Sequence, residues 1–338
     1  MKKISFVFMI LVSLTVSGQN AGVKRIGIIG LDTSHATTFA TMLNDKDANP
    51  EFADFRVTSA YPWGSRTIEE GYSRIPMFTE KIKSLGIKIA DSIDELLQEV
   101  DYVMLETQDG HLHVEQALAV FKAGKPVFID KPMAANLADV CLIYDLAAKY
   151  NIPVYTTSSF RYIDPVLEVS SGKKGRVLGA DCYGPCKEEP SHESLYWYGI
   201  HGVEMLFTIM GTGCETVIRT HTKDTDMAVG TWKDSRVGSY RGMRIGNEHY
   251  YHFGGSAFCE KGPVRLDNYA GFGYPGLMKE MLNFFRTGIV PVKPETTIEV
   301  YAFMEASTLS YKTGKPVKID DVIQKAKKTA KKKLAKYK

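Results

Sequence analysis

The chain has 338 residues, of which 44% are hydrophobic and 24% are charged. This length suggests two domains, and the composition excludes a mainly disordered, collagen-like or coiled-coil protein. Five cysteines are too few for a disulfide scaffold. Residues 1–20 and 324–338 hold ten lysines and no acidic residue, so the rest of the chain has 32 basic against 39 acidic residues. An acidic body argues against a nucleic-acid partner.

The first residues have the pattern of an export signal. Lys2 and Lys3 precede an apolar run over residues 4–16, and small residues follow up to Gly18. This arrangement predicts a secretory signal peptide over residues 1–18, with a buried first strand or helix as the alternative. Thirteen apolar residues are too few to span a bilayer comfortably. We therefore expect an exported, periplasmic protein with no membrane span after cleavage.

Short apolar runs then alternate with helical patterns up to residue 157. Strands are predicted over residues 23–30, 55–61, 102–105, 127–129 and 154–156. Helices are predicted over residues 35–43, 92–99, 114–123 and 137–150. Strands that alternate with helices at this spacing predict an α/β domain over residues 22–157, built on a parallel, doubly wound sheet.

The second half of the chain has a different pattern. Alternating polar and apolar residues predict antiparallel strands over residues 177–183, 216–221, 249–258 and 263–268. Helices are predicted over residues 202–210, 276–285 and 297–308. We expect a second domain over residues 158–323 and a lysine-rich tail over residues 324–338. The tail is typical of a solvated helix face, with binding to an anionic surface as the alternative.

Several segments resemble one oxidoreductase family. The sequence GKPVFIDKPMA at residues 124–134 resembles the GKHVFVEKPLA segment of the Gfo/Idh/MocA oxidoreductases. Further similar segments follow the family's order: DGHLH at 109–113, FRYIDP at 160–165, GIHGVE at 199–204, and an ending from EA at 305–306 to GKPV at 314–317. The resemblance implies an N-terminal Rossmann domain. It also implies a C-terminal α/β domain with an open, mainly antiparallel sheet that often forms homo-oligomer contacts.

The resemblance also implies an activity. Family members oxidise or reduce a secondary hydroxyl of a sugar or sugar derivative with NAD or NADP. Lys131 matches the lysine between nicotinamide and substrate, where an ammonium group stabilises developing alkoxide charge. His201 matches the catalytic histidine, because imidazole accepts a proton near neutral pH. Tyr198 is the third catalytic candidate. The alternatives are a lysine in an ordinary turn and a core histidine.

The remaining candidates are assigned by their places in these segments. The cofactor-binding candidates are Gly30, Asp32, Thr33, Ser34, His35, Arg66, Thr107, His111, Asp130 and Lys131. The substrate-binding candidates are Arg161, Tyr196 and Trp197, whose aromatic members would stack on a sugar face. No metal site is expected, because the spaced pairs His111 with His113 and His249 with His252 lack a clear third and fourth ligand.

The phosphate loop departs from the family's pattern. It reads GLDTSH where G-x-G-x-x-G is expected, so only Gly30 is kept. Asp32 brings a carboxylate to the place of the pyrophosphate, and two such charges about 4 Å apart repel by about 1 to 4 kcal/mol. Asp32 could instead cap the next helix, or face a substrate or metal together with His35. Arg66 could meet a 2′-phosphate, and Trp197 replaces an aspartate frequent in the family.

These departures leave other functions open. One alternative is a non-redox enzyme that performs elimination or hydrolysis on a keto-sugar, because Lys131 and His201 also suit proton abstraction beside a carbonyl. Another is a sugar-binding protein that has lost nucleotide binding. Cys182 and Cys186 could form a disulfide across a turn, or remain as two buried thiols.

Overall fold

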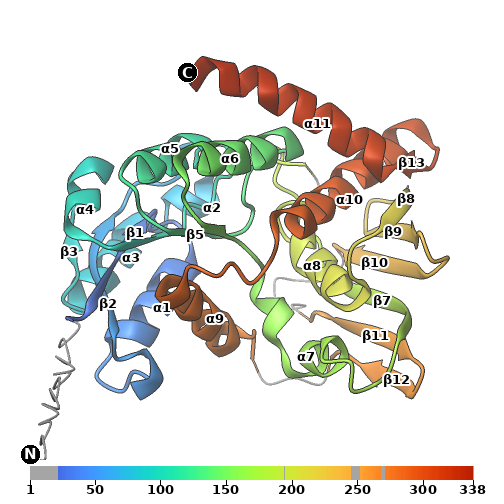
Figure 1. The fold of residues 1–338 in the computed structure, drawn as a ribbon, viewed down its shortest axis with the longest axis horizontal. Coiled ribbons are helices and arrows are strands. Elements are labelled where there is room, and N and C mark those ends of the chain that lie inside the picture. Colours follow the sequence, from blue (N-terminus) through green and yellow to red (C-terminus); the bar gives the residue numbers. More distant parts are fainter. Residues whose placement is uncertain (1–21, 194, 245–251, 268–270, 338) are drawn as a thin grey trace, which may run out of the picture.

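The computed structural model describes residues 22–193, 195–244, 252–267 and 271–337. The predicted signal peptide lies outside the described residues, and so do residues 249–251 and 268 of the predicted strands. Within the described ranges, none of the helices combines the length and apolar character needed to cross a membrane. The chain forms two α/β units side by side, which we name the N-terminal and C-terminal units (Figure 1).

The N-terminal unit is a six-stranded parallel sheet in the order β3-β2-β1-β4-β5-β6. Its strands are β1 Lys24–Ile29, β2 Phe55–Tyr61, β3 Lys88–Ile89, β4 Tyr102–Leu105, β5 Val127–Ile129 and β6 Val154–Tyr155. The apolar runs become strands because both faces of this sheet are covered by helices. β1 and β4 pair in parallel from Ile26 with Tyr102 to Ile29 with Leu105. The predicted doubly wound parallel sheet is therefore confirmed.

Helices cover the two faces of this sheet. They are α1 Ser34–Asn44, α2 Glu69–Tyr72, α3 Ile75–Ser84, α4 Ile93–Glu99, α5 His113–Lys122 and α6 Leu137–Tyr150, with a short 3₁₀ turn η1 at Pro50–Phe52. Residues of α4, α5 and α6 share one buried apolar cluster, and α1 belongs to a second cluster. Helix α9 (Tyr274–Thr287) joins this second cluster and lies beside α1 (Figure 1). The second half of the chain therefore returns to complete the core of the N-terminal unit.

The C-terminal unit is a seven-stranded sheet in the order β12-β11-β7-β10-β9-β8-β13. Its strands are β7 Val177–Pro185, β8 Cys214–His221, β9 Thr225–Trp232, β10 Val237–Met243, β11 Gly254–Cys259, β12 Gly262–Arg265 and β13 Val317–Lys318. The sheet is mainly antiparallel, as expected, but β7 and β10 pair in parallel. β9 and β10 were not predicted from the sequence. Cys182 and Cys186, in β7 and directly after it, are buried free thiols.

The remaining helices pack on this sheet or link the two units. They are η2 Ser159–Tyr162, α7 Asp164–Ser170, α8 Gly199–Met210, α10 Pro294–Thr313, α11 Ile319–Leu334 and η3 Ala335–Tyr337. α11 packs on α6 and buries Val322, Ala326 and Ala330 while its lysines face outward. Lys333 forms an ion pair with Asp139 at 2.6 Å. The lysine-rich tail is therefore mostly the solvated face of a helix.

Candidate active site

The three catalytic candidates lie together between the two units. Lys131 follows β5 at the carboxyl edge of the parallel sheet, and Tyr198 and His201 lie at the start of α8. The Lys131 ammonium nitrogen is 5.9 Å from the centroid of the Tyr198 ring. That ring centroid lies 6.4 Å from the centroid of the His201 ring. The carboxyl edge of such a sheet is where α/β proteins bind ligands, so this arrangement is a candidate active site.

His201 is buried and held by a hydrogen bond to Ser158. Its Nδ1 lies 2.7 Å from the Ser158 hydroxyl oxygen, which also accepts the backbone N–H of Phe160 at 3.2 Å. Burial, together with the positive charges of Lys131 and His35, lowers the pKa of His201 well below its usual range. His201 is therefore a neutral imidazole at neutral pH. When Nδ1–H donates to Ser158, the Nε2 lone pair is free to accept a proton.

Arg161 is committed to a buried ion pair. Its guanidinium lies 2.6 Å from the Glu204 carboxylate, and its Nε donates to the Thr157 hydroxyl at 3.0 Å. The side chains of Arg161 and Glu204 are 14% and 2% exposed. Removing one partner of such a pair leaves the other charge buried without compensation. Arg161 thus ties η2 to α8 beneath His201, and it has little surface left for a substrate.

The structure corrects the expectation that Tyr196 and Trp197 stack on a sugar. Tyr196 is fully buried, and its hydroxyl donates to the backbone carbonyl of Tyr301 at 3.3 Å. Trp197 is 3% exposed, and its ring centroid lies 5.2 Å from that of His192. Neither ring offers an exposed face. Aromatic residues pack in cores as readily as at sugar sites, and here they join α8 to the core.

The loop after β1 keeps the first glycine of a phosphate loop, but a side chain of the loop itself caps the helix that follows. Gly30 has a φ of +92°, and a side chain there would collide with the main chain of Thr107. The hydroxyl of Thr33 accepts the backbone N–H of His35 at 3.0 Å and so caps α1. Ser34 follows as an exposed residue of the first turn. The helix cap is therefore Thr33, and the expectation that Asp32 could cap α1 is wrong.

Asp32 instead joins the loops that follow β2 and β4. Its fully buried carboxylate accepts the backbone N–H of Ser65 at 2.7 Å and that of Gln108 at 3.0 Å. Burial raises the pKa of Asp32 to about 6, although both backbone donors oppose the rise. A side chain at Gly64 would collide with this carboxylate. The loop after β2 therefore closes over Asp32. The two backbone N–H groups that Asp32 accepts lie close to the path expected for a dinucleotide.

A second group of titratable residues lies at the ends of β4 and β5. His35 Nδ1 is 2.8 Å from Asp130 Oδ2, and His35 Nε2 is 3.2 Å from the Tyr274 hydroxyl. Glu106 follows β4 and is fully buried, and neither of its carboxylate oxygens has a hydrogen-bond partner among the described residues. Burial and the nearby charge of Asp130 raise the pKa of Glu106 well above its usual range. Glu106 was not among the predicted site residues, although an acidic residue directly after a buried strand is a usable signal.

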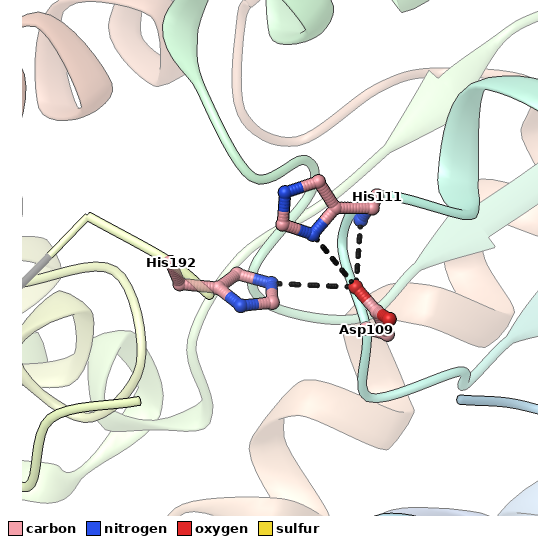
Figure 2. A group of neighbouring side chains, drawn as sticks. All are labelled: Asp109, His111 and His192. Carbon is pink, nitrogen blue, oxygen red and sulfur yellow. Dashed lines mark hydrogen bonds and ion pairs between the residues drawn. The ribbon is translucent and has the colours of Figure 1, made fainter. Parts of the chain in front are cut away.

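His111 belongs to a separate cluster that joins the units further along the loop after β4 (Figure 2). His111 Nδ1 lies 2.9 Å from Asp109 Oδ1, and His192 Nε2 lies 3.7 Å from the same oxygen. Gly110 N–H donates to His192 Nε2 at 3.2 Å, and the Ser191 hydroxyl lies 2.9 Å from His192 Nδ1. Burial lowers the pKa of His192 to about 4. His192, which the sequence analysis missed, is therefore a neutral ring with both nitrogens hydrogen-bonded.

The residues present fit the two ends of a nicotinamide adenine dinucleotide better than its middle. Trp63 and Arg66 line a pocket of about 370 Å³ at the end of β2, which suits an aromatic base and a phosphate or ribose. Thr107 Oγ1 and Gln108 Oε1 are buried without a hydrogen-bond partner within the described ranges, and they suit hydroxyl or amide donors. Asp32 occupies the region between them. Both end groups therefore have suitable residues, and the pyrophosphate would lie beside a carboxylate.

Comparison with known proteins identifies a family for the N-terminal unit. Residues 24–157 match the model of the Gfo/Idh/MocA family, an oxidoreductase family with an NAD-binding Rossmann fold. An uncharacterized oxidoreductase of Streptococcus pneumoniae is 26% identical over 216 residues, which are 55% of this chain and 58% of that protein. An uncharacterized protein of Saccharomyces cerevisiae is 28% identical over 145 residues, 37% of this chain and 41% of that protein. The matched segments thus cover 41% and 58% of the length of these two relatives.

Solved structures share the fold of both units. A probable dehydrogenase from Thermotoga maritima aligns with a TM-score of 0.73 at 21% identity, over 88% of this chain and 99% of that one. Scyllo-inositol dehydrogenase from Lactobacillus casei, solved with bound NAD(H) and scyllo-inositol, aligns with a TM-score of 0.71 at 16% identity, also over 88% and 99%. At these identities the likeness shows the fold alone. The family match assigns residues 24–157 to the NAD-binding Rossmann fold of the Gfo/Idh/MocA oxidoreductases, and the structural similarity extends the shared fold to the second unit.

Proposed function

We propose that the protein transfers hydride between NAD or NADP and the carbon that bears a secondary hydroxyl in a sugar or polyol. The observation that carries this proposal is the meeting of Lys131, Tyr198 and His201 at the carboxyl edge of the Rossmann sheet. The family match supports the redox chemistry. The similarity in fold to a scyllo-inositol dehydrogenase supports a polyol-like substrate.

Each catalytic candidate has a distinct role in this proposal. When bound, the nicotinamide ring supplies the site that accepts or donates hydride. His201 Nε2 takes the proton from the substrate hydroxyl, while its Nδ1–H donates to Ser158 and fixes the ring. The Lys131 ammonium donates a hydrogen bond to the same oxygen and stabilises its developing negative charge. The Tyr198 ring, 5.9 Å from the Lys131 nitrogen, holds the ammonium in place by a cation–π contact.

The carboxylates of Asp32 and Glu106 favour a second candidate function. Both are buried at the strand ends, where a dinucleotide would bring its phosphates. If they prevent nucleotide binding, His201 and Lys131 can still remove a proton beside a carbonyl and stabilise the resulting enolate. The product would then arise by elimination or hydrolysis of a keto-sugar, with no transfer of hydride.

A binding and turnover experiment tests the first proposal. NAD and NADP are titrated into the purified protein by calorimetry, and turnover of scyllo-inositol and a panel of aldoses is followed by nicotinamide absorbance. We expect one nucleotide to bind and at least one polyol or sugar to be oxidised. Lys131→Met should lower kcat by about a hundredfold or more, and Lys122→Met, an exposed change on α5, should leave it unchanged. Turnover that survives in Lys131→Met would contradict the assigned role.

We also propose that the protein forms a homo-oligomer through the open face of the C-terminal sheet. Leu178, Ile218, Val237 and Phe258 are large apolar residues on its strands, each 44–50% exposed. Exposed apolar surface of this kind favours association. Light scattering should give more than one chain per particle, and Ile218→Lys should produce monomers. A wild-type monomer at micromolar concentration would contradict this.

We further propose that the protein is exported to the periplasm by residues 1–18. N-terminal sequencing of the protein from a periplasmic fraction should begin shortly after Gly18. A chain that retains Met1 and stays with the cytoplasmic fraction would contradict export.

A further inference from the structure

Three potential metal ligands converge where the Rossmann sheet meets α1. Nitrogen and oxygen atoms of His35, Glu106 and Asp130, one from each residue, all lie within 4.8 Å of one another. All three residues are buried. His35 is the second residue of α1, and Glu106 and Asp130 directly follow β4 and β5. The parallel sheet brings such residues together because the carboxyl ends of its strands lie along one edge.

The charges of this cluster do not balance within the described residues. Glu106 and Asp130 are joined by the nearby carboxylate of Asp32, and Lys131 is the cation that acts on both Glu106 and Asp130. A histidine that binds a metal is neutral, so with His35 as a ligand three carboxylates face one ammonium, and two negative charges remain because His201 is also neutral. Burial of an ionised carboxylate without a partner is very costly. Glu106 would bear this cost most directly, because neither of its carboxylate oxygens has a hydrogen-bond partner in the part of the chain that the structure describes.

The distances suit coordination of one ion. Ligand atoms about 2.1 Å from a common ion are about 3 Å apart at a right angle, and at most about 4.2 Å apart across it. His35 Nδ1 and Asp130 Oδ2 are 2.8 Å apart, close to the shorter value. The ligand atom of Glu106 lies within 4.8 Å of the other two, so it would have to move by up to about 1.8 Å to bind beside them. Its two free oxygens allow it to bind through one or both.

The second ring nitrogen of His35 is placed to make the hydrogen bond that a metal-bound histidine usually makes. Metal-bound histidines donate their other ring N–H to an oxygen, which fixes the ring. His35 Nε2 lies 3.2 Å from the hydroxyl of Tyr274, at the start of α9. The oxygen of this hydroxyl can accept the Nε2–H of His35.

In the cluster shown in Figure 2, by contrast, the potential metal-binding atoms already have hydrogen-bond partners. Asp109, His111 and His192 also bring three ligand atoms within 4.8 Å of one another. However, Gly110 N–H already donates to the His192 nitrogen that would bind a metal, and both Asp109 oxygens accept hydrogen bonds. This cluster has no unpartnered carboxylate, and it serves as the internal control.

We propose that His35, Glu106 and Asp130 form a binding site for one divalent cation. One imidazole and two carboxylates suit Mn²⁺ or Zn²⁺ better than softer ions. The ion would supply the two positive charges that the cluster lacks. It would also lie beside Lys131, where it can bind an oxygen of the substrate. The inference goes beyond the proposed function, which requires no metal.

The test is metal binding in the absence of nucleotide and substrate. The full chain is treated with a chelator, and Mn²⁺ is then titrated while free Mn²⁺ is followed by electron paramagnetic resonance. Zn²⁺ is titrated in parallel by calorimetry. We expect one ion per chain. Glu106→Gln should weaken binding at least tenfold, and Tyr274→Phe should weaken it about tenfold. Glu106→Gln keeps the side-chain shape and removes a buried charge, so the variant should fold.

The control variant and the contrary outcomes complete the test. His192→Gln changes the control cluster and should leave the affinity for Mn²⁺ unchanged. No bound ion at millimolar Mn²⁺ and Zn²⁺ would overturn the proposal. So would an ion that His192→Gln removes and Glu106→Gln does not. Because no nucleotide or polyol is present, these results are independent of whether the protein proves to be a dehydrogenase.

Discussion

Replacing the buried carboxylate of Asp32 should change how stability depends on pH. The rise of its pKa from 3.8 to about 6 means that the folded state holds this proton more tightly than the unfolded state. The free energy of unfolding therefore falls as pH rises through this window. At about 1.4 kcal/mol per pH unit, the full penalty is about 3 kcal/mol, of which about 2 kcal/mol develops between about pH 4.5 and pH 7.

Asp32→Asn removes this titration and keeps the size of the side chain. Its amide oxygen can accept only one of the two backbone N–H groups well. This lowers the free energy of unfolding by an amount that does not vary with pH. We expect the variant to gain about 2 kcal/mol relative to the wild type between about pH 4.5 and pH 7. Urea unfolding at a series of pH values measures this difference directly.

A matched control is available at Asp54. Its hydrogen bond to Arg286 lowers the pKa of Asp54 to about 2, so its contribution is constant above about pH 4.5. Asp54→Asn should therefore lose stability by a similar amount throughout the tested range. If Asp32→Asn and the wild type also differ by a constant amount, Asp32 does not titrate as a buried acid. The claim that the loop after β2 closes over the Asp32 carboxylate would then be wrong.

Three further predictions concern the candidate active site. His201→Gln should lower kcat by about a hundredfold to ten-thousandfold at saturating substrate, and unchanged kcat would exclude it as the base. Because the pKa of His201 is lowered, kcat/KM of the wild type should stay constant down to below about pH 6.5, and a fall that begins above neutral pH would oppose this. Arg161→Met should cost about 3–5 kcal/mol in urea unfolding because it strands Glu204, and Glu204→Gln in the same variant should restore part of the loss.

The sequence predicted the parallel sheet well because its strands are buried on both faces. Such strands are continuous apolar runs, and glycine marks their turns. β9 and β10 were missed because, apart from Trp232 and Tyr240, their buried positions are mostly small or charged. Asp226 of β9 is fully buried against Arg219 and Arg244, and Gly230 and Gly238 lie beneath larger side chains. This alternation is regular in the structure, but it is not an alternation of polar and apolar residues.

The candidate site was predictable where a motif carried it. Lys131 and His201 lie in segments with a recognisable sequence, and the structure places both between the units. Glu106 and His192 depend on partners from distant loops, and no local pattern reveals such partners. Tyr196 and Trp197 show the opposite error, since aromatic composition alone does not separate a sugar-binding face from a core. The return of α9 to the N-terminal unit likewise has no signal in the order of the elements.

Isotope transfer tests the central claim most directly. A polyol that proves to be a substrate, with scyllo-inositol as the first choice, is deuterated at its ring carbons and incubated with the protein and NAD or NADP. Mass spectrometry then follows the deuterium. Hydride transfer predicts that deuterium moves from the carbon to the nicotinamide ring, and that Lys131→Met and His201→Gln suppress the transfer. Deuterium released into water, with none on the nicotinamide, would contradict hydride transfer and favour proton abstraction.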